Sequence, residues 1–155
     1  MERPFRVLIA DDRRAARRGL RALLSLFPEV EVIGEAADGQ EALVLVSRHR
    51  PDVVVLDIEM PVIDGVEATR RVKGEWPEVR VVVLTIHATY RASALAAGAD
   101  AFLLKGCTAQ EMRRAILPSP RPAQGQTMGG GSGGIAANGP TPEGECYHDR
   151  HTTES

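Results

Sequence analysis

The chain has 155 residues, of which 43% are hydrophobic and 26% are charged, and its formal net charge at neutral pH is −2. This composition fits one soluble domain with room for a tail, and the charge gives no sign of a nucleic-acid or membrane partner. No apolar run approaches the length of a membrane span, and the N-terminus lacks the apolar segment of a signal peptide. The two cysteines show no paired spacing, so we expect a cytoplasmic protein.

Short apolar segments recur along the chain and predict five strands, at 6–10, 30–36, 52–56, 80–84 and 101–104. They contain few polar residues, which is typical of strands buried on both faces of a parallel sheet. Between and after them lie segments with helical periodicity or capping residues, at 13–27, 40–49, 65–74, 89–97 and 108–117. Alternation of this kind predicts the α/β class, with a doubly wound, five-stranded parallel sheet.

The first predicted helix is rich in arginine: Arg13, Arg14, Arg17, Arg18 and Arg21. Such a stretch is either a solvated helix face or a docking face for an acidic partner. The composition alone leaves both interpretations open.

The chain changes character at Pro118. The last 38 residues hold eight Gly and five Pro, and Ile135 is their only Leu, Ile, Val or Phe. Such a segment cannot bury enough apolar area to offset its ordering entropy. We therefore expect a domain at 1–117 and a disordered tail at 118–155. Cys146, His148 and His151 are too few, on such a segment, to predict a metal site.

Polar residues stand where four of the predicted strands end: Asp11 and Asp12 after the first, Asp57 after the third, Thr85 after the fourth and Lys105 after the fifth. In open parallel sheets, ligands bind outside the carboxyl ends of the strands. Each residue alone has a simpler explanation, such as a helix cap, but their convergence on one edge favours a site.

The charges of these residues indicate what the site would bind. Two carboxylates ~4 Å apart repel by roughly 4 kcal/mol at an effective dielectric of 20, so three need cations nearby. Lys105 supplies one positive charge, and Mg²⁺, which prefers carboxylate oxygens, suits the rest. A phosphoryl group fits between a metal ion, an ammonium and a threonine hydroxyl, and Asp57 would be the nucleophile that accepts it.

Four motifs, "VLIADD", "DIEMPVIDG", "VVVLT" and "GADAFLLKG", occur in an order and spacing that resemble the receiver domains of bacterial two-component response regulators. Residues 5–117 carry this resemblance, and "RRGLRALL" is most similar to the NarL/LuxR-type branch. The resemblance implies a flavodoxin-like fold with strand order 2-1-3-4-5. It also implies a signalling protein, not a turnover enzyme, in which a sensor histidine kinase transfers a phosphoryl group to Asp57.

The resemblance further implies four Mg²⁺ ligands: Asp11, Asp12, Asp57 and the backbone carbonyl of Glu59. Thr85 and Lys105 would contact the phosphoryl group. Phe102 would be the switch aromatic whose rotamer follows Thr85, although a core aromatic is the simpler interpretation of that residue. Glu59 and His87 occupy the positions at which the family tunes its dephosphorylation rate.

The chain also departs from the family. Gly106 replaces a common proline, so we do not infer a cis peptide there. Ile86 replaces a common small residue after Thr85, so we expect narrower access to the phosphoryl site. Pro118 limits the length of the last helix. Relatives of this branch continue into a helix-turn-helix domain, whereas the residues after 118 have no helical periodicity. We therefore expect that the tail is not the native C-terminus of this family but a frameshifted or truncated end.

These departures leave alternatives for function and assembly. We expect no DNA binding by this chain alone, and DNA-binding transcription regulation is the alternative function. Homodimerisation stays open, because the usual dimer face includes the shortened last helix. A phosphohydrolase of the haloacid-dehalogenase sort fits poorly, because that class needs its pair of acids on the first strand with a threonine soon after, whereas Asp12 is followed by arginines.

Overall fold

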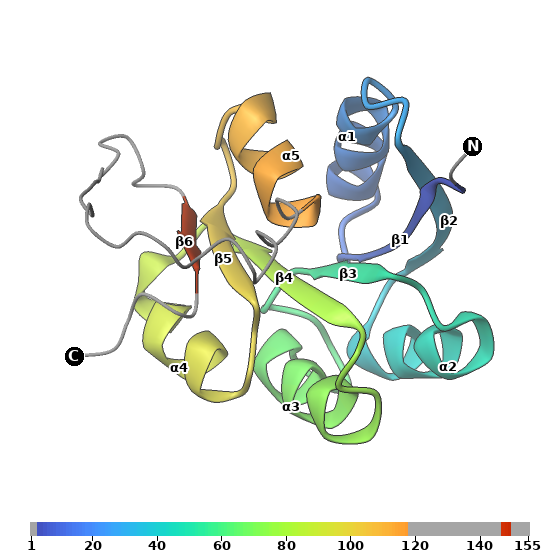
Figure 1. Ribbon diagram of the computed structural model, residues 1–155. Coiled ribbons are helices and arrows are strands. Elements are labelled where there is room, and N and C mark those ends of the chain that lie inside the picture. The colour runs from blue at the N-terminus through green and yellow to red at the C-terminus, as the bar shows by residue number, and fades with distance from the viewer. Residues whose placement is uncertain (1–2, 118–146, 150–155) are drawn as a thin grey trace, which may run out of the picture.

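The structure is a computed structural model that describes residues 3–117 and 147–149. Strands and helices alternate along the first of these ranges (Figure 1). The strands are β1 (Phe5–Ala10), β2 (Val30–Ala36), β3 (Val53–Leu56), β4 (Arg80–Thr85), β5 (Ala101–Leu104) and β6 (Tyr147–Asp149). The helices are α1 (Arg14–Leu24), α2 (Gly39–His49), α3 (Gly65–Glu75), α4 (Arg91–Ala96) and α5 (Ala109–Ile116), with a 3-10 helix, η1 (Ala88–Tyr90), before α4. All five predicted strands and all five predicted helices are present, with ends that differ by a few residues.

The strands form one sheet in the order β2-β1-β3-β4-β5-β6. β1 to β5 run parallel, which confirms the predicted flavodoxin-like order 2-1-3-4-5. β6 pairs antiparallel with β5 at the outer edge of the sheet. Nothing in the sequence predicts this three-residue strand, because its short polar segment has no strand periodicity. The rest of the predicted tail, 118–146 and 150–155, lies outside the described residues.

Helices cover both faces of the sheet (Figure 1): α1 and α5 lie on one face, and α2, α3 and α4 lie on the other. Side chains alternate between the faces along each strand, so the molecule has two apolar cores. Val7 and Ile9 of β1 pack on the α1 and α5 side with Leu24, whereas Leu8 packs on the opposite side with Val46. No helix in the described ranges is long and apolar enough to cross a membrane.

Capping residues fix where the helices begin. The Asp38 side chain accepts a hydrogen bond at 2.7 Å from a backbone N–H in the first turn of α2. Thr108 and Glu111 form a reciprocal capping box at the start of α5. Both caps lie at the starts of helices that the sequence predicts. α5 has eight residues, and Leu117 follows as its C-cap, so the last helix is as short as Pro118 led us to expect.

The parallel order brings four strand ends to one edge of the sheet. Asp11 directly follows β1, Asp57 directly follows β3, Thr85 is the last residue of β4 and Lys105 directly follows β5. Because β3 lies between β1 and β4, Asp57 occupies the middle of this edge.

Candidate functional site

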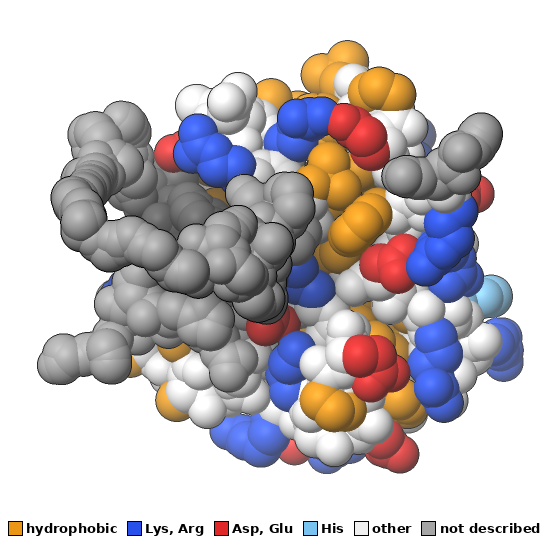
Figure 2. Space-filling model, in the orientation of Figure 1, with side chains coloured by type: hydrophobic (Ala, Val, Ile, Leu, Met, Phe, Trp, Pro, Cys, Tyr) orange, Lys and Arg blue, Asp and Glu red, His pale blue; other side chains and the backbone are white. Residues whose placement is uncertain are grey.

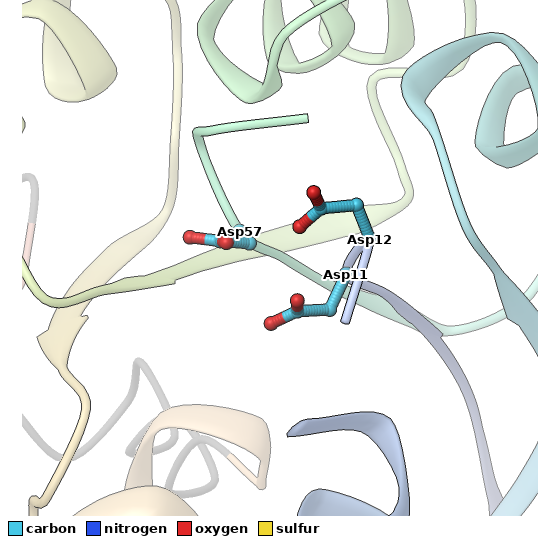
Figure 3. A group of neighbouring side chains, drawn as sticks. All are labelled: Asp11, Asp12 and Asp57. Carbon is cyan, nitrogen blue, oxygen red and sulfur yellow. The ribbon is translucent and has the colours of Figure 1, made fainter. Parts of the chain in front are cut away.

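Three carboxylates converge at the carboxyl ends of β1 and β3 (Figure 3). Oxygen atoms of Asp11, Asp12 and Asp57 all lie within 4.8 Å of one another. Asp11 and Asp57 are buried, at 5% and 8% exposure, whereas Asp12 is exposed. The structure thus brings together the three acids that the sequence places at this edge.

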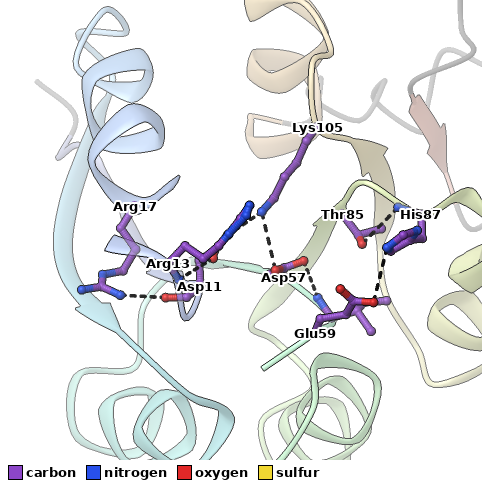
Figure 4. Close-up of polar contacts among 9 residues, drawn as sticks. Asp11, Arg13, Arg17, Asp57, Glu59, Thr85, His87 and Lys105 are labelled. Carbon is purple, nitrogen blue, oxygen red and sulfur yellow. Dashed lines mark hydrogen bonds and ion pairs between the residues drawn. The ribbon is translucent and has the colours of Figure 1, made fainter. Parts of the chain in front are cut away.

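Lys105 supplies the positive charge beside these acids (Figure 4). Its Nζ donates a hydrogen bond to Asp11 Oδ2 at 2.7 Å and lies 3.5 Å from Asp57 Oδ2. The Lys105 backbone N–H donates to the Thr85 carbonyl oxygen at 2.8 Å, which fixes the base of the lysine against β4. One ammonium therefore serves two buried carboxylates that come from different strands.

The electrostatics of Asp57 show that this charge balance is incomplete. Burial raises the pKa of Asp57, Lys105 opposes the rise, and the neighbouring carboxylate of Asp11 adds to it. A hydrogen bond from the Ile58 N–H at 2.8 Å also favours the charged form, yet the pKa stays above its ordinary value. The charged form of Asp57 is therefore under-stabilised by the groups that surround it.

The donor set fits a hard divalent cation. It consists of carboxylate oxygens drawn from two neighbouring strand ends, and oxygen is the ligand that Mg²⁺ prefers. No other group of three or more His, Cys, Asp or Glu side chains in the described ranges could hold a metal ion. An added positive charge would also stabilise the charged form of Asp57, and so offset the desolvation and the repulsion by Asp11 that raise its pKa.

The loop between β3 and α3 is packed directly against the acid. The Gly65 N–H donates to the Ile58 carbonyl at 2.8 Å, which folds the loop back on the end of β3. A Cβ atom on Gly65 would lie 2.1 Å from the Asp57 carbonyl oxygen, so no side chain fits there. The glycine that the motif "DG" supplies therefore lets α3 begin in contact with the Asp57 backbone.

The same loop contains a strained turn. The Ile63 N–H donates to the Pro61 carbonyl at 2.8 Å across Val62, whose φ is +69°. A γ-turn with positive φ is rare, and a β-branched residue adopts it at a cost of roughly 1–3 kcal/mol. Val62 is 75% exposed, so little packing within the described domain offsets that strain.

A second polar group lies beside the acids (Figure 4). The buried hydroxyl of Thr85 accepts a long hydrogen bond, 3.4 Å, from the His87 N–H. The carboxylate of Glu59 lies 3.4 Å from His87 Nε2 and accepts a hydrogen bond of the same length from the Tyr90 hydroxyl. His87 and Glu59 are about half exposed, so this group forms a polar rim and is not part of the core.

Phe102 lies on β5, directly opposite Val83 of β4. Because residues two apart on a strand point to the same face, Thr85 shares the face of Val83 and therefore that of Phe102. Phe102 is 1% exposed and packs in the core on the α2, α3 and α4 side. The aromatic ring is thus inside the molecule in this structure.

Several contacts had no signal in the sequence. Arg17 donates to the Asp11 carbonyl at 2.8 Å and to the Glu35 carboxylate at 3.0 Å, and Arg21 pairs with the same carboxylate. These two arginines therefore tie α1 to β2. Three others are exposed and form no ion pair within the described ranges: Arg13, Arg14 and Arg18. Tyr90 contacts Glu59, and likewise nothing in its spacing along the sequence connects it to the acids.

A cavity of about 210 Å³ opens beside Lys105, between α1 and α5. Its walls include Leu20 and Leu23 of α1 and Met112 of α5, and Asp11 lies at its polar end. Figure 2 shows hydrophobic side chains reaching the surface where α1 lies in this view. The acidic site therefore borders an apolar surface on this side.

Comparison with known proteins places these features in a family. A family model of the response regulator receiver domain matches residues 7–117. The transcriptional regulatory protein DegU of Brevibacillus brevis is 38% identical over 117 residues, which cover 74% of this chain and 50% of that protein. The response regulator protein VraR of Staphylococcus aureus is 36% identical over 121 residues, which cover 76% of this chain and 57% of VraR. The chain therefore spans about half the length of these curated relatives.

Solved structures show the same similarity. The signal receiver domain of the putative response regulator NarL from Mycobacterium tuberculosis has a TM-score of 0.71 at 38% identity, covering 75% of this chain and 95% of that one. A two-component response regulator of the LuxR family from Aurantimonas sp. has a TM-score of 0.69 at 33% identity, covering 73% and 82%. The similarity to the NarL/LuxR-type branch is confirmed.

Proposed function

This chain belongs to the family of response regulator receiver domains of two-component systems, and from that premise we propose that Asp57 accepts a phosphoryl group from a sensor histidine kinase. The observation that carries the proposal is the buried carboxylate of Asp57, whose pKa is raised by burial and by Asp11 while Lys105 lies 3.5 Å away. A nucleophile with an under-stabilised charge, beside a cation that can bind the incoming phosphoryl oxygens, suits phosphoryl transfer.

In the proposed step, an oxygen of Asp57 attacks phosphorus and the bond from phosphorus to the donor's imidazole nitrogen breaks. The electron pair of the broken bond stays on that nitrogen, and the aspartate becomes an acyl phosphate. The Lys105 ammonium already contacts Asp11 and Asp57, so it is placed to shift toward the phosphoryl oxygens. The protein is then modified once per signal and is not a turnover enzyme.

Asp11, Asp12, Asp57 and the backbone carbonyl of Glu59 are the proposed ligands of Mg²⁺. When bound, the ion supplies charge neutralisation for the carboxylates and for the oxygens of the transferred group. The three side chains already lie within reach of one ion. The Glu59 carbonyl is included through the family resemblance alone.

The proposed switch links Thr85 to Phe102. Phosphorylation adds roughly −1.5 to −2 charge if it behaves as on hydroxyl side chains, and a hydroxyl bond to that charge is worth roughly 1.5–3 kcal/mol. Among the described residues, the one hydrogen bond of the Thr85 hydroxyl is the long bond from the His87 N–H, so this hydroxyl can move toward the phosphoryl group at little cost. Its movement would open space for the ring of Phe102, which lies on the same face of the sheet. Substituting Thr85→Ala should leave Asp57 able to accept phosphate but abolish the response of the Phe102 ring, which ¹⁹F-labelled phenylalanine would report.

Glu59 and His87 are proposed to set how long the phosphoryl group lasts. They form the exposed rim of the site and contact each other at 3.4 Å, so they can control the approach of water. Glu59→Ala and His87→Ala should change the half-life of the phosphorylated chain without lowering its maximal yield. An unchanged half-life in both variants would remove this role.

The direct test is incubation with acetyl phosphate and Mg²⁺, followed by intact-mass measurement. We expect a phosphate adduct on the wild-type chain, none on Asp57→Ala, and an adduct on Asp52→Asn, which alters an aspartate at the opposite end of the same strand. An adduct that persists in Asp57→Ala would show that another residue is the acceptor.

A second candidate function is sequence-specific DNA binding. The curated relative DegU is named a transcriptional regulatory protein, and this chain spans about half its length. Each of the five α-helices at 14–116 contacts the sheet of the receiver domain. We propose that this described part of the chain does not bind DNA by itself. A gel-shift assay at low salt tests this, and sequence-specific retardation would favour the second function.

We further propose a cytoplasmic location for the protein. Homodimerisation can be measured by analytical ultracentrifugation with and without acetyl phosphate.

A further inference from the structure

The two outer strands of the five-stranded parallel sheet differ in how their free edges are protected. β2, at one side, carries Glu31 and Glu35, and charged side chains on an edge strand discourage pairing with other chains. β5, at the other side, has the sequence AFLL and no charged residue. An apolar edge strand of this kind is a template for a further strand unless something covers it.

In this structure the edge of β5 is covered. The segment β6 pairs with it antiparallel, with Leu103 opposite Tyr147, Phe102 opposite His148 and Ala101 opposite Asp149. β6 lies at the outer side of β5 (Figure 1), and residues 118–146 separate it from α5 in the sequence. The cover therefore comes from the same chain, beyond the end of the receiver domain.

The extent of the pairing indicates that the cover is reversible. Only three residues pair on each strand, and a strand pair of that length is marginal by itself in water. Attachment to the same chain raises the effective concentration of the segment at the edge, which favours occupation without new contacts. A longer extended segment with more backbone hydrogen bonds could replace it.

We propose that the outer edge of β5 is a strand-accepting docking surface, and that its occupant is the chain's own segment Tyr147–Asp149. While that segment is bound, the edge is closed to other extended peptides and to a second copy of the chain. Release of the segment opens a site for an extended peptide that pairs antiparallel with residues 101–103. The surface and its occupant are independent of phosphoryl transfer to Asp57.

Backbone amide hydrogen exchange by NMR on the full, unphosphorylated chain tests the proposal. Successive backbone N–H groups of a strand point to opposite sides, so either Tyr147 or His148 donates toward β5. Proline has no N–H, so the double variant Tyr147→Pro/His148→Pro removes that donor in either case. The matched control, His151→Pro/Thr152→Pro, places the same residues just beyond β6. We expect the β5 amides that point away from β4 to exchange roughly threefold to tenfold faster in the first variant than in wild type. The control should match wild type, and amides of β1 and β3 should be unchanged in both variants.

Two results would overturn the proposal. Equal exchange of the β5 amides in all three proteins would show that β6 does not cover the edge. Protection that grows with protein concentration would show that a second copy, and not the chain's own segment, is the occupant. Because no phosphodonor is present, neither result depends on whether Asp57 is the acceptor.

Discussion

Strand β3 has an aspartate immediately before it and another immediately after it, and the two have opposite environments. Asp52, at the amino end, accepts hydrogen bonds from the Arg6 N–H at 2.8 Å and from both terminal nitrogens of Arg3 at 3.1 Å. Asp57, at the carboxyl end, has one N–H donor and a shared ammonium, with two other carboxylates close by. The same residue type on the same strand is thus satisfied at one end and under-stabilised at the other.

The pKa values follow this difference. Burial raises the pKa of Asp52, but the hydrogen bonds and charges of Arg3 and Arg6 outweigh it and hold the pKa below its ordinary value. Burial also raises the pKa of Asp57, and Lys105 fails to outweigh burial together with Asp11. An aspartate that the fold satisfies contributes to stability, whereas one that the fold leaves short of partners is available for binding and chemistry.

The largest expected effect on stability is at Asp52. Asp52→Ala should lower the free energy of unfolding by about 2 kcal/mol, because it leaves the half-buried Arg6 N–H without an acceptor. Urea denaturation would measure it. Glu67→Ala, which removes an exposed carboxylate paired with Arg71 on α3, is the control and should have a much smaller effect. Equal effects in the two variants would contradict the special role of Asp52.

At Asp57, the expected change in the free energy of unfolding is smaller and opposite in sign. Asp57→Asn should raise the free energy of unfolding by about 1 kcal/mol in metal-free buffer, because it removes one of three mutually repelling carboxylates. Adding MgCl₂ should stabilise wild type by about 1.4 kcal/mol when the ion is at ten times its Kd, and should stabilise Asp57→Asn less. A loss of stability in Asp57→Asn would mean that Lys105 already compensates the cluster.

As the pH falls, the destabilisation by the charge of Asp57 should disappear before the stabilisation by the charge of Asp52. The folded-state pKa of Asp57 is raised, so the destabilisation by its charge is fully present above that pKa and disappears as the pH falls toward the unfolded value of 3.8. The folded-state pKa of Asp52 is lowered, so its stabilisation is present above 3.8 and is lost only as the pH falls through that lower pKa. Urea melts across this range should show Asp57→Asn converging with wild type first. Convergence of Asp52→Ala at the higher pH would contradict the assigned shifts.

The smallest effect concerns the loops that flank β3. Val62, after the strand, and Arg50, before it, are the two non-glycine residues with positive φ within the described ranges. Val62→Gly should stabilise the domain by about 0.5 to 1 kcal/mol, because it relieves a strained β-branched residue. Arg50→Gly should gain less, because Arg50 also lies 5.5 Å over the Trp76 ring. Thermal unfolding of both variants, with acetyl phosphate labelling, would show whether relief of the strain at Val62 alters the site.

Much of this architecture could be predicted from the sequence because its signals are local. The apolar run before Asp57 marks a buried strand, Asp38 and Thr108 mark helix starts, and the parallel topology then collects the strand ends at one edge. The contacts that could not be predicted join residues that are far apart in the sequence and come together only in the folded chain. Arg17 reaches Glu35 across the α1 and β2 interface, and the pairing of β6 with β5 joins segments that no short-range pattern relates.

The charge count at the acidic edge has a consequence for the whole molecule. Asp11, Asp12 and Asp57 against Lys105 give −3 + 1 = −2, and the formal charge of the entire chain is also −2. The formal charges of all the other residues in the sequence therefore cancel in sum. Binding of a single divalent cation at this edge would bring the formal charge of the chain to zero, so the mobility of the protein toward the anode in a native gel near neutral pH should fall as this site fills.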